Sequence, residues 1–296
     1  MTSLNRILPV VFLASTLIRS EAAPDIMTHP DNSTAWILQN DEFLWGGGMS
    51  REHWLAAANT FEVEPSENGL RITSNPVEGG GIPSATRYMS FDPDYPWLQF
   101  DVSDAGRLEG YSALTMYIPG EDKTFVRSCV GELPEGRYVT RLTPNASTAD
   151  TGVFPLRLDI SGLQFVLKDF SMRKDPLPRI TVDPVDSSIK VPGIGDEMKV
   201  TVYLADPAED VSVELFNSYL GTPLKIKTSG SLQLKPEDSE GKIWAGTFDL
   251  QKMIVKPVEK GKPVPAGRLL FKATILGGNF PQPLMTWNEQ AWEVNP

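Results

Sequence analysis

The residue types that usually carry acid–base chemistry are unevenly supplied in this chain. It has 38 Asp and Glu residues but only two histidines, His29 and His53. A Ser-His-Asp or Cys-His arrangement would have to use one of these two, and His53 has no partner that is recognisable in the sequence. One cysteine and two distant histidines do not supply ligands at the spacings of a zinc site. These counts favour a non-catalytic protein.

Carboxylate pairs are the remaining route to hydrolysis, because glycoside cleavage needs only two acids roughly 5–10 Å apart. Asp92 and Asp94 are the visible candidates, together with Asp101 and Asp104. With 38 acids in the chain, a close pair also arises by chance. Asp92 and Asp94 flank a proline, and Asp is favoured in such turns because it bonds to its own backbone. A turn, a calcium site and a catalytic pair all remain open for these residues.

Aromatic side chains are the better indication of binding, and they gather in the first half of the chain. Sugar rings present apolar C–H faces and polar hydroxyl edges, so a planar ring with Asp, Asn or Arg nearby suits them. The alternative is that these large rings fill the interior of a β-domain. The candidate ligand-binding residues are Trp45, Tyr88, Tyr95, Trp97 and Tyr117.

Composition limits the class of protein. The 296 residues are enough for two domains of ordinary size, and 41% apolar with 22% charged residues disfavours disorder. The formal charge of −11 disfavours nucleic acid as a partner, because phosphate binding needs clustered Lys and Arg. Cys129 is the single cysteine and cannot form an internal disulfide. The fold must therefore depend on its cores, and we expect the Cys129 thiol inside one of them.

The N-terminal residues have the pattern of a secretory signal. Arg6 supplies a positive charge, Ile7–Ile18 is an apolar run, and small residues near Ala22 suit cleavage. The run is shorter than the ~20 residues of a membrane span, so no membrane insertion is expected after cleavage. We predict a signal peptide at 1–22, a polar tail or linker at 23–35, and a secreted, periplasmic or cell-surface location.

Apolar residues that alternate with polar ones, between turn residues, predict an all-β protein. In Trp97–Val102 the aliphatic and Phe side chains point to one face, and Gln99 and Asp101 point outward on the other. The second half repeats the pattern, for example in Met198–Leu204 and Leu269–Ile275. Many short strands of this kind, with plentiful Gly and Pro, are typical of β-sandwiches.

The stretch from 156 to 184 organises the rest of the chain. Two strand-like segments lead into a stiff proline joint at Asp175–Pro178, and a new strand begins at Arg179. The apolar parity changes near Leu167, which predicts a β-bulge there. We therefore predict two β-sandwich domains that meet at the joint, the first at 36–175 and the second at 176–296.

Several first-half segments, taken together, resemble a jelly-roll module of the galactose-binding or carbohydrate-binding type. Pro134–Tyr138 is similar to the turn-then-strand step of such modules. Leu167–Met172 is similar to their last strand, in which an acid precedes an apolar-alternating run. Asn40–Phe43 is a looser match to their opening segment, with Leu44 where an acid stands in the family. This resemblance implies glycan binding, and it implies a structural calcium ion with Asp169 as a ligand.

The second half resembles a bacterial Ig-like module. The resemblance is carried by Ile180–Pro184, then by Gly195–Val202, and later by Ala266–Leu269. Together the two resemblances imply a jelly-roll domain followed by an Ig-like spacer.

We therefore expect a secreted, non-catalytic protein that binds a polysaccharide or another glycan through its first domain. No cofactor is expected beyond the calcium ion that the resemblance implies. Two other hypotheses remain: a structural or adhesive cell-surface protein without a sugar site, and a carbohydrate-active hydrolase or its remnant. These residues do not indicate an oligomeric state.

Overall fold

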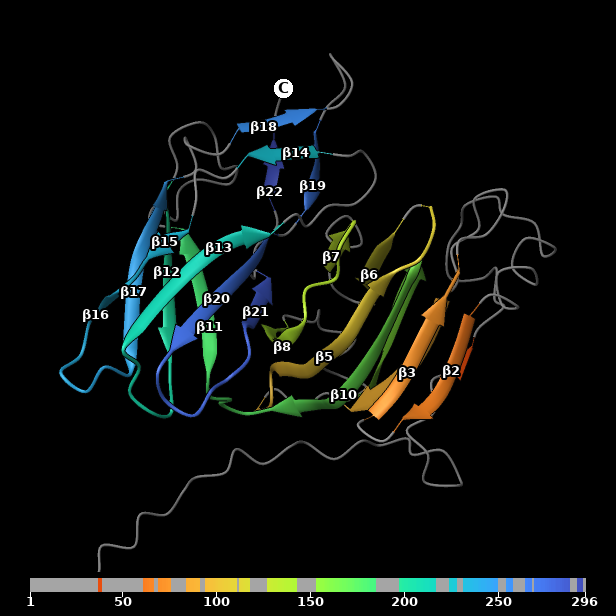
Figure 1. Ribbon diagram of the computed structural model, residues 1–296, viewed down its shortest axis with the longest axis horizontal. Coiled ribbons are helices and arrows are strands. Elements are labelled where there is room, and N and C mark those ends of the chain that lie inside the picture. The colour runs from red at the N-terminus through yellow and green to blue at the C-terminus, as the bar shows by residue number, and fades with distance from the viewer. Residues whose placement is uncertain are drawn as a thin grey trace, which may run out of the picture.

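The computed structural model describes residues 37–38, 61–66, 69–75, 84–90, 94–110, 112–117, 127–142, 153–184, 197–216, 224–227, 231–249, 254–257, 264–267, 269–287 and 292–294. Within these ranges every regular element is a β-strand, so the all-β class is confirmed (Figure 1). No helix in the same ranges is long and apolar enough to span a membrane. The predicted signal peptide at 1–22 and the tail at 23–35 lie outside the described residues.

The strands of the first half precede the proline joint. They are β1 (Ile37–Leu38), β2 (Phe61–Ser66), β3 (Gly69–Ser74), β4 (Ser84–Ser90), β5 (Trp97–Arg107), β6 (Ala113–Tyr117), β7 (Arg127–Val130), β8 (Gly136–Arg141), β9 (Val153–Ser161) and β10 (Leu163–Arg173).

The strands of the second half follow the joint. They are β11 (Arg179–Pro184), β12 (Glu197–Tyr203), β13 (Asp210–Phe216), β14 (Leu224–Lys227), β15 (Leu232–Gln233), β16 (Lys235–Pro236), β17 (Ile243–Asp249), β18 (Ile254–Pro257), β19 (Val264–Gly267), β20 (Leu270–Leu276), β21 (Leu284–Trp287) and β22 (Trp292–Val294).

One sheet runs through both halves of the chain. Its nine strands have the order β15-β13-β20-β21-β8-β5-β10-β3-β2. The two halves meet where β21 pairs with β8 in parallel, with Leu284 opposite Arg137 and Met285 opposite Tyr138. We call this β8–β21 pair the seam. In Figure 1 the blue and cyan strands of the second half continue through it into the olive and orange strands of the first.

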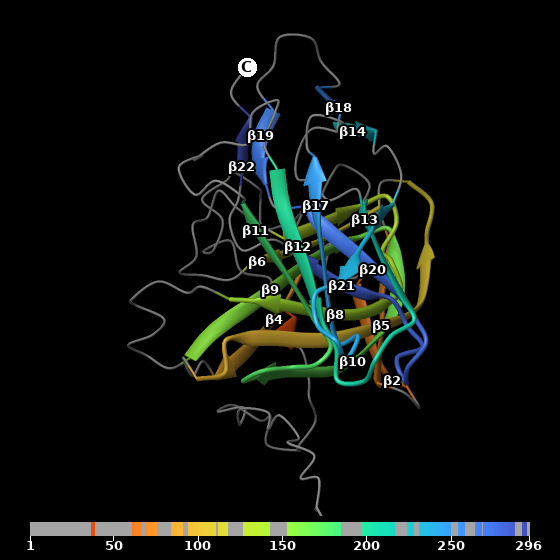
Figure 2. The ribbon, with the colours of Figure 1, turned by 90° about the vertical axis from the view of Figure 1, so that its left-hand side faces the viewer.

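Two further sheets cover opposite ends of this long sheet. A five-stranded sheet, β1-β4-β9-β6-β7, lies against the first-half end, and a four-stranded sheet, β11-β12-β17-β16, lies against the second-half end (Figure 2). β14 pairs with β18 and β19 with β22 in two separate two-stranded sheets. The described part of the chain is therefore a set of facing sheets, as expected of an all-β protein.

The first core lies between the five-stranded sheet and the first-half end of the long sheet. Its fully buried members include Leu98 of β5, Met116 of β6, Ile160 of β9 and Phe165 of β10. These side chains lie on the apolar faces that the alternation of their strands predicts.

Residues from the far end of the chain complete this first core. Met285 and Trp287 of β21 are buried in it, as is Leu270 of β20. The Trp287 ring lies 5.3 Å from that of Tyr138, which in turn stacks on Phe100 at 4.8 Å between centroids. The first half therefore does not fill its own interior.

The second core shows the reciprocal arrangement. Met198–Leu204 and Leu269–Ile275 supply its apolar faces, as their alternation predicts. Trp97 of β5 and Val139 of β8, which belong to the first half, are buried in this core as well. Each core therefore includes residues from the other half of the chain, on the far side of the seam.

This sharing changes which side chains are buried near the seam. Gln99 and Asp101 of β5 were expected to point outward, yet only 8% and 2% of their surfaces are exposed. The expected alternation along β5 is correct, but the second face of the strand is also covered. Each of the four residues of β21 is buried for the same reason.

The local predictions around the joint are confirmed. β10 ends at Arg173 and β11 begins at Arg179. The pairing of β10 with β5 shifts register between Lys168 and Ser171, and Asp169 there has a φ of 54°. This is the β-bulge that the change of apolar parity predicts, because one extra residue reverses the faces of the residues that follow it.

Cys129 is 1% exposed within the first core, which confirms its predicted place. Burial raises the pKa of the thiol to about 12, so it stays protonated at neutral pH and is a poor nucleophile. We expect the native protein to resist iodoacetamide at pH 8, and the chain unfolded in guanidinium to react. Rapid alkylation of the native protein would contradict this.

The same shift predicts an alkaline loss of stability. An unfolded thiol loses its proton near its ordinary pKa of about 8.5, whereas the native thiol keeps it. The free energy of unfolding is therefore expected to fall as the pH rises from about 8.5 towards 12. Denaturant titrations at pH 8 and pH 10 measure the loss, and a Cys129→Ala variant should show a smaller one. Equal losses in the two proteins would contradict the assignment to Cys129.

Candidate functional site

Arg137 stands at the seam, on the face of β8 opposite to Tyr138. The turn before it is set by Gly136, whose φ of 145° is one that residues with a Cβ rarely adopt. A Cβ on Gly136 would also lie 2.4 Å from the backbone oxygen of Pro283. This close approach lets the backbone N–H of Arg137 donate to the Pro283 oxygen at 2.9 Å. The Arg137 side chain is thereby directed to the face that the second half covers.

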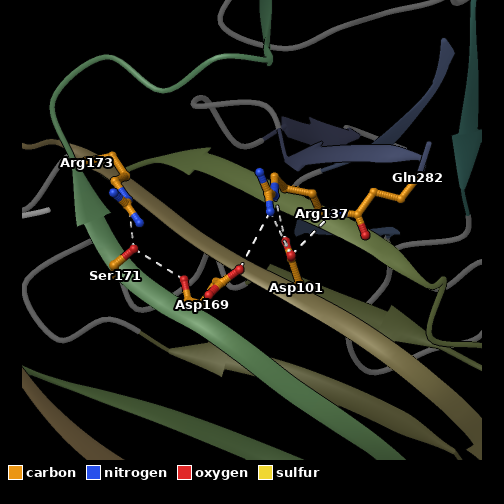
Figure 3. A network of polar contacts seen from close by, with 6 residues as sticks. All are labelled: Asp101, Arg137, Asp169, Ser171, Arg173 and Gln282. Carbon is orange, nitrogen blue, oxygen red and sulfur yellow. Dashed lines mark hydrogen bonds and ion pairs between the residues drawn. The ribbon is translucent and has the colours of Figure 1, made fainter. Parts of the chain in front are cut away.

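A bidentate ion pair joins Arg137 to Asp101 (Figure 3). The two residues are directly opposite each other on β8 and β5. Arg137 Nε donates to Asp101 Oδ1 at 2.7 Å, and Nη2 donates to Oδ2 at 2.8 Å. The Asp101 side chain is 3% exposed and that of Arg137 is 23% exposed, so the pair is largely shielded from water. Such paired geometry is among the stronger hydrogen-bonding arrangements in proteins.

The second half contributes directly to this pair. Gln282, in the turn before β21, donates from Nε2 to Asp101 Oδ2 at 3.4 Å. The hydrogen bonds with Asp101 raise the pKa of Arg137 above its ordinary value, so the guanidinium stays charged. Its carbon lies 5.7 Å from the ring centroid of Phe280. Arg137 is therefore a fixed cation between groups from both halves.

Asp169 reaches the same cation from the bulge in β10. Its Oδ2 lies 3.7 Å from Arg137 Nη2, and its side chain is 56% exposed. Ser171 Oγ donates to the backbone oxygen of Asp169 at 3.2 Å, and Arg173 Nε donates to Ser171 Oγ at 2.9 Å. The bulge is thus held by the ion pair with Arg137 and by the hydrogen bonds of Ser171 (Figure 3).

The surroundings of Asp169 do not fit the calcium ion that the resemblance implies. Its carboxylate is paired with the Arg137 guanidinium at 3.7 Å, and that cation would repel a divalent ion placed beside it. Calcium binding requires six to eight oxygen ligands. Across the described residues, no group of three or more His, Cys, Asp and Glu side chains is arranged to hold a metal ion.

A pocket of about 170 Å³ opens beside Arg137. Three connections of the second half form its walls: the joint before β11, the turn after β12, and the turn between β20 and β21. We call it the seam pocket, and it is lined by Arg137, Leu177, Pro178, Leu204, Ala205, Asp206, Ile275, Gly277, Gly278, Asn279 and Phe280.

The seam pocket combines an apolar wall with a few polar groups. Leu204 and Ile275 are buried, whereas Leu177 is 45% exposed. Asn279 Nδ2 donates to Asp206 Oδ2 at 3.3 Å on the exposed side. Among its described lining residues, only Arg137 and Asp206 are ionisable. Such a mixture suits the binding of a small ligand better than acid–base catalysis, because Arg137 does not give up its proton.

The structure does not gather the predicted aromatic residues into one described surface. Trp97 is 8% exposed and is part of the second core, with the Arg179 guanidinium 5.9 Å from its ring centroid. Tyr95 is partly buried against the first core. The Trp97 ring therefore presents no open face to a ligand, because the second half packs over β5.

Of the remaining predicted site residues, Tyr88 and Tyr117 lie in strands and Asp94 lies before β5. Tyr88 and Tyr117 lie in β4 and β6, which pair with opposite edges of β9, but their side chains lie outside the description. Trp45 and Asp92 lie outside the described residues altogether. Asp94 is exposed and is described without Asp92, so their proposed pairing as carboxylates is not visible.

The residues of the seam pocket were not predicted as a site. In the sequence, Arg137 belongs to the Pro134–Tyr138 turn and Asp101 is predicted as an outward-facing acid. No local pattern links them, because they are 36 positions apart, and Gln282 is 181 positions from Asp101. The one signal in the sequence is that Asp101 lies in a segment, Trp97–Val102, that is otherwise rich in apolar residues.

No protein-family model matches the chain, and no curated protein is similar enough to count as a relative.

Proposed function

We propose that this chain is a secreted, non-catalytic protein that binds a glycan. The seam pocket is the observation that carries the proposal. It places an aromatic ring, a fixed guanidinium, an amide and a carboxylate around a space of about 170 Å³. Sugars are recognised by such a combination, with ring C–H groups against apolar walls and hydroxyl groups against polar side chains.

The size of the pocket supports binding of a single ring. An apolar cavity of about 150 Å³ accepts a benzene molecule. The seam pocket is slightly larger, and Leu177 in its lining is 45% exposed, so the pocket is partly open to solvent. Secretion is supported by Arg6 and the apolar run Ile7–Ile18 at the N-terminus.

In this proposal the first half is a jelly-roll module of the galactose-binding type and the second half is an Ig-like module. Two facing sheets in each half support that assignment, as does the Pro134–Tyr138 turn leading into β8. The ligand site differs from the one expected from the aromatic residues of the first half. It uses residues of the second half, which is then part of the binding protein and not only a spacer.

A structural or adhesive role is the second candidate. The observation that favours it is the continuous nine-stranded sheet, which prevents the two halves from moving independently. A rigid link of this kind suits a protein that holds a fixed shape on a cell surface, and it requires no sugar site.

Native affinity electrophoresis separates the two candidates. The mature chain, residues 23–296, is expected to be retarded in gels that contain at least one neutral polysaccharide, such as a galactan, a glucan or a mannan. Serum albumin in the same gels is the control for sieving. Unchanged mobility across a broad panel of polysaccharides would reject glycan binding and leave the structural role.

A further inference from the structure

The charges around the seam pocket are unequal. Arg137 is the one cation among the described residues that line the pocket. Two nitrogens of its guanidinium donate hydrogen bonds to Asp101. Asp169 lies 3.7 Å from the same guanidinium, and Asp206 forms part of the wall. Two carboxylates therefore flank the one cation of the lining, and a third carboxylate belongs to the wall, in a chain whose formal charge is −11. An anionic ligand would meet a net negative field there.

The free hydrogen-bonding groups favour a ligand that both donates and accepts. A guanidinium has five N–H donors, and Asp101 occupies those of Nε and one side of Nη2. Arg137 Nη1 makes no hydrogen bond within the described part of the chain. Asp206 accepts one hydrogen bond from Asn279 and has lone pairs left over. Hydroxyl groups satisfy both residues, whereas a carboxylate would satisfy Arg137 and repel Asp206.

The walls favour a ring with apolar faces. Phe280 contributes its aromatic ring, and the Arg137 guanidinium, 5.7 Å from the ring centroid, helps to hold it in place. Leu204 and Ile275 are buried apolar residues of the lining, and Leu177 adds an apolar side chain that is 45% exposed. A pyranose ring matches this arrangement, because its C–H groups pack against such walls while its hydroxyl groups reach Asp206 and Arg137.

We propose that the seam pocket binds one neutral pyranose residue and discriminates against acidic sugars. This inference rests on the proposed glycan binding and adds both the site and the class of sugar. Discrimination arises from Asp206 and from the pairing of Arg137 with Asp101, which leaves no net positive charge for a uronic acid.

Calorimetric titration with methyl pyranosides tests the proposal. The neutral probes are the methyl glycosides of glucose, galactose and mannose, and the acidic probes are those of glucuronic and galacturonic acid. At least one neutral probe is expected to bind, with an affinity at least tenfold higher than that of its acidic counterpart. The difference should persist in 0.5 M NaCl, because salt screens the distant charges of the protein more than the adjacent Asp206.

Two exposed leucines provide a matched pair of variants. Leu177 lines the seam pocket, and Leu276 is 54% exposed at the end of β20 and is not among the lining residues. Leu177→Ala is expected to weaken binding of the neutral probe severalfold, and Leu276→Ala to leave it unchanged. Because both side chains are already exposed, both variants should keep the near-ultraviolet circular dichroism of the parent protein.

A second pair of variants tests the charge argument. Asp206→Asn is expected to reduce the preference for the neutral probe severalfold, while Glu237→Gln leaves it unchanged. Glu237 is an exposed acid that pairs with Lys199, and neither residue is among the lining residues. This second acid controls for the loss of one negative charge anywhere on the protein.

The possible outcomes separate the site from the function. Retention on a polysaccharide that is unaffected by Leu177→Ala would overturn the pocket and leave glycan binding intact. Equal or tighter binding of the acidic probes would overturn the preference for neutral sugars. If the parent protein is retained by no polysaccharide and binds no probe, the proposed function fails and this inference fails with it.

Discussion

Chains cut at the predicted domain boundary, into residues 23–175 and 176–296, are expected not to fold as soluble monomers. The first fragment loses Leu270, Met285 and Trp287 from its core, and the second loses Trp97 and Val139. Loss of one Trp side chain from a core costs about 3–5 kcal/mol. A typical domain has only about 5–15 kcal/mol of stability, so several such losses exceed what either fragment can tolerate.

Cutting the chain also exposes the seam. β8 would lose its parallel neighbour β21, and each strand would become an open edge that favours aggregation. Soluble yield, size-exclusion chromatography and near-ultraviolet circular dichroism of each fragment measure the effect. Co-expression of the two fragments is the control, because it restores the shared cores without the covalent link. A separate fragment of 23–175 that unfolds cooperatively as a monomer would contradict this prediction.

The intact chain is expected to unfold as one cooperative unit. Trp287→Ala, in β21, removes a side chain from the first core and should lower the stability of both halves by about 3–5 kcal/mol. Two separate transitions in denaturant, of which only one responds to this variant, would show that the halves are independent.

Replacing Arg137 by Met is expected to destabilise the protein by about 3–5 kcal/mol, because it leaves the buried Asp101 carboxylate without its charged partner. The reverse variant, Asp101→Asn, should cost less. The Arg137 side chain is 23% exposed against 3% for Asp101, so an unpaired guanidinium has some access to water. Guanidinium titrations of the free energy of unfolding measure both effects.

The double variant Asp101→Leu with Arg137→Met distinguishes a lost partner from lost packing. Apolar replacement of a whole buried ion pair is often close to neutral, so the double variant should be more stable than Arg137→Met alone. The single variant Asp101→Leu completes the cycle, and a double variant that loses the sum of the Asp101→Leu and Arg137→Met effects would show that the pair has no special coupling. Ser171→Ala is a mild control, since its hydroxyl supports only the Asp169 bulge.

Much of the strand pattern was predictable, because it depends on residues that are close together in the sequence. The apolar faces of Met198–Leu204 and Leu269–Ile275 follow from alternation alone. The bulge near Leu167 follows from a change of parity within one strand, and the start of β11 at Arg179 follows from the prolines before it. Each of these features needs only a few neighbouring residues to be recognised.

The candidate site was less predictable, for a physical reason that Trp97 and Asp101 illustrate. Alternation assigns each of them to a face of β5, but it does not say whether another layer covers that face. The sequence leaves both a sugar platform and a core position open for Trp97, and the structure places it in the second core. Asp101 was expected outside, and it is buried against Arg137.

By itself the amino-acid sequence determined the all-β class, the apolar faces of Trp97–Val102, Met198–Leu204 and Leu269–Ile275, and the burial of Cys129. Only the tertiary structure decided that β8 and β21 pair in parallel and that Arg137 meets Asp101 and Gln282 beside a pocket. The reason is that strand formation depends on neighbours in the chain. Pairing between distant strands depends on how whole faces are buried, and that is settled only when all the layers have come together.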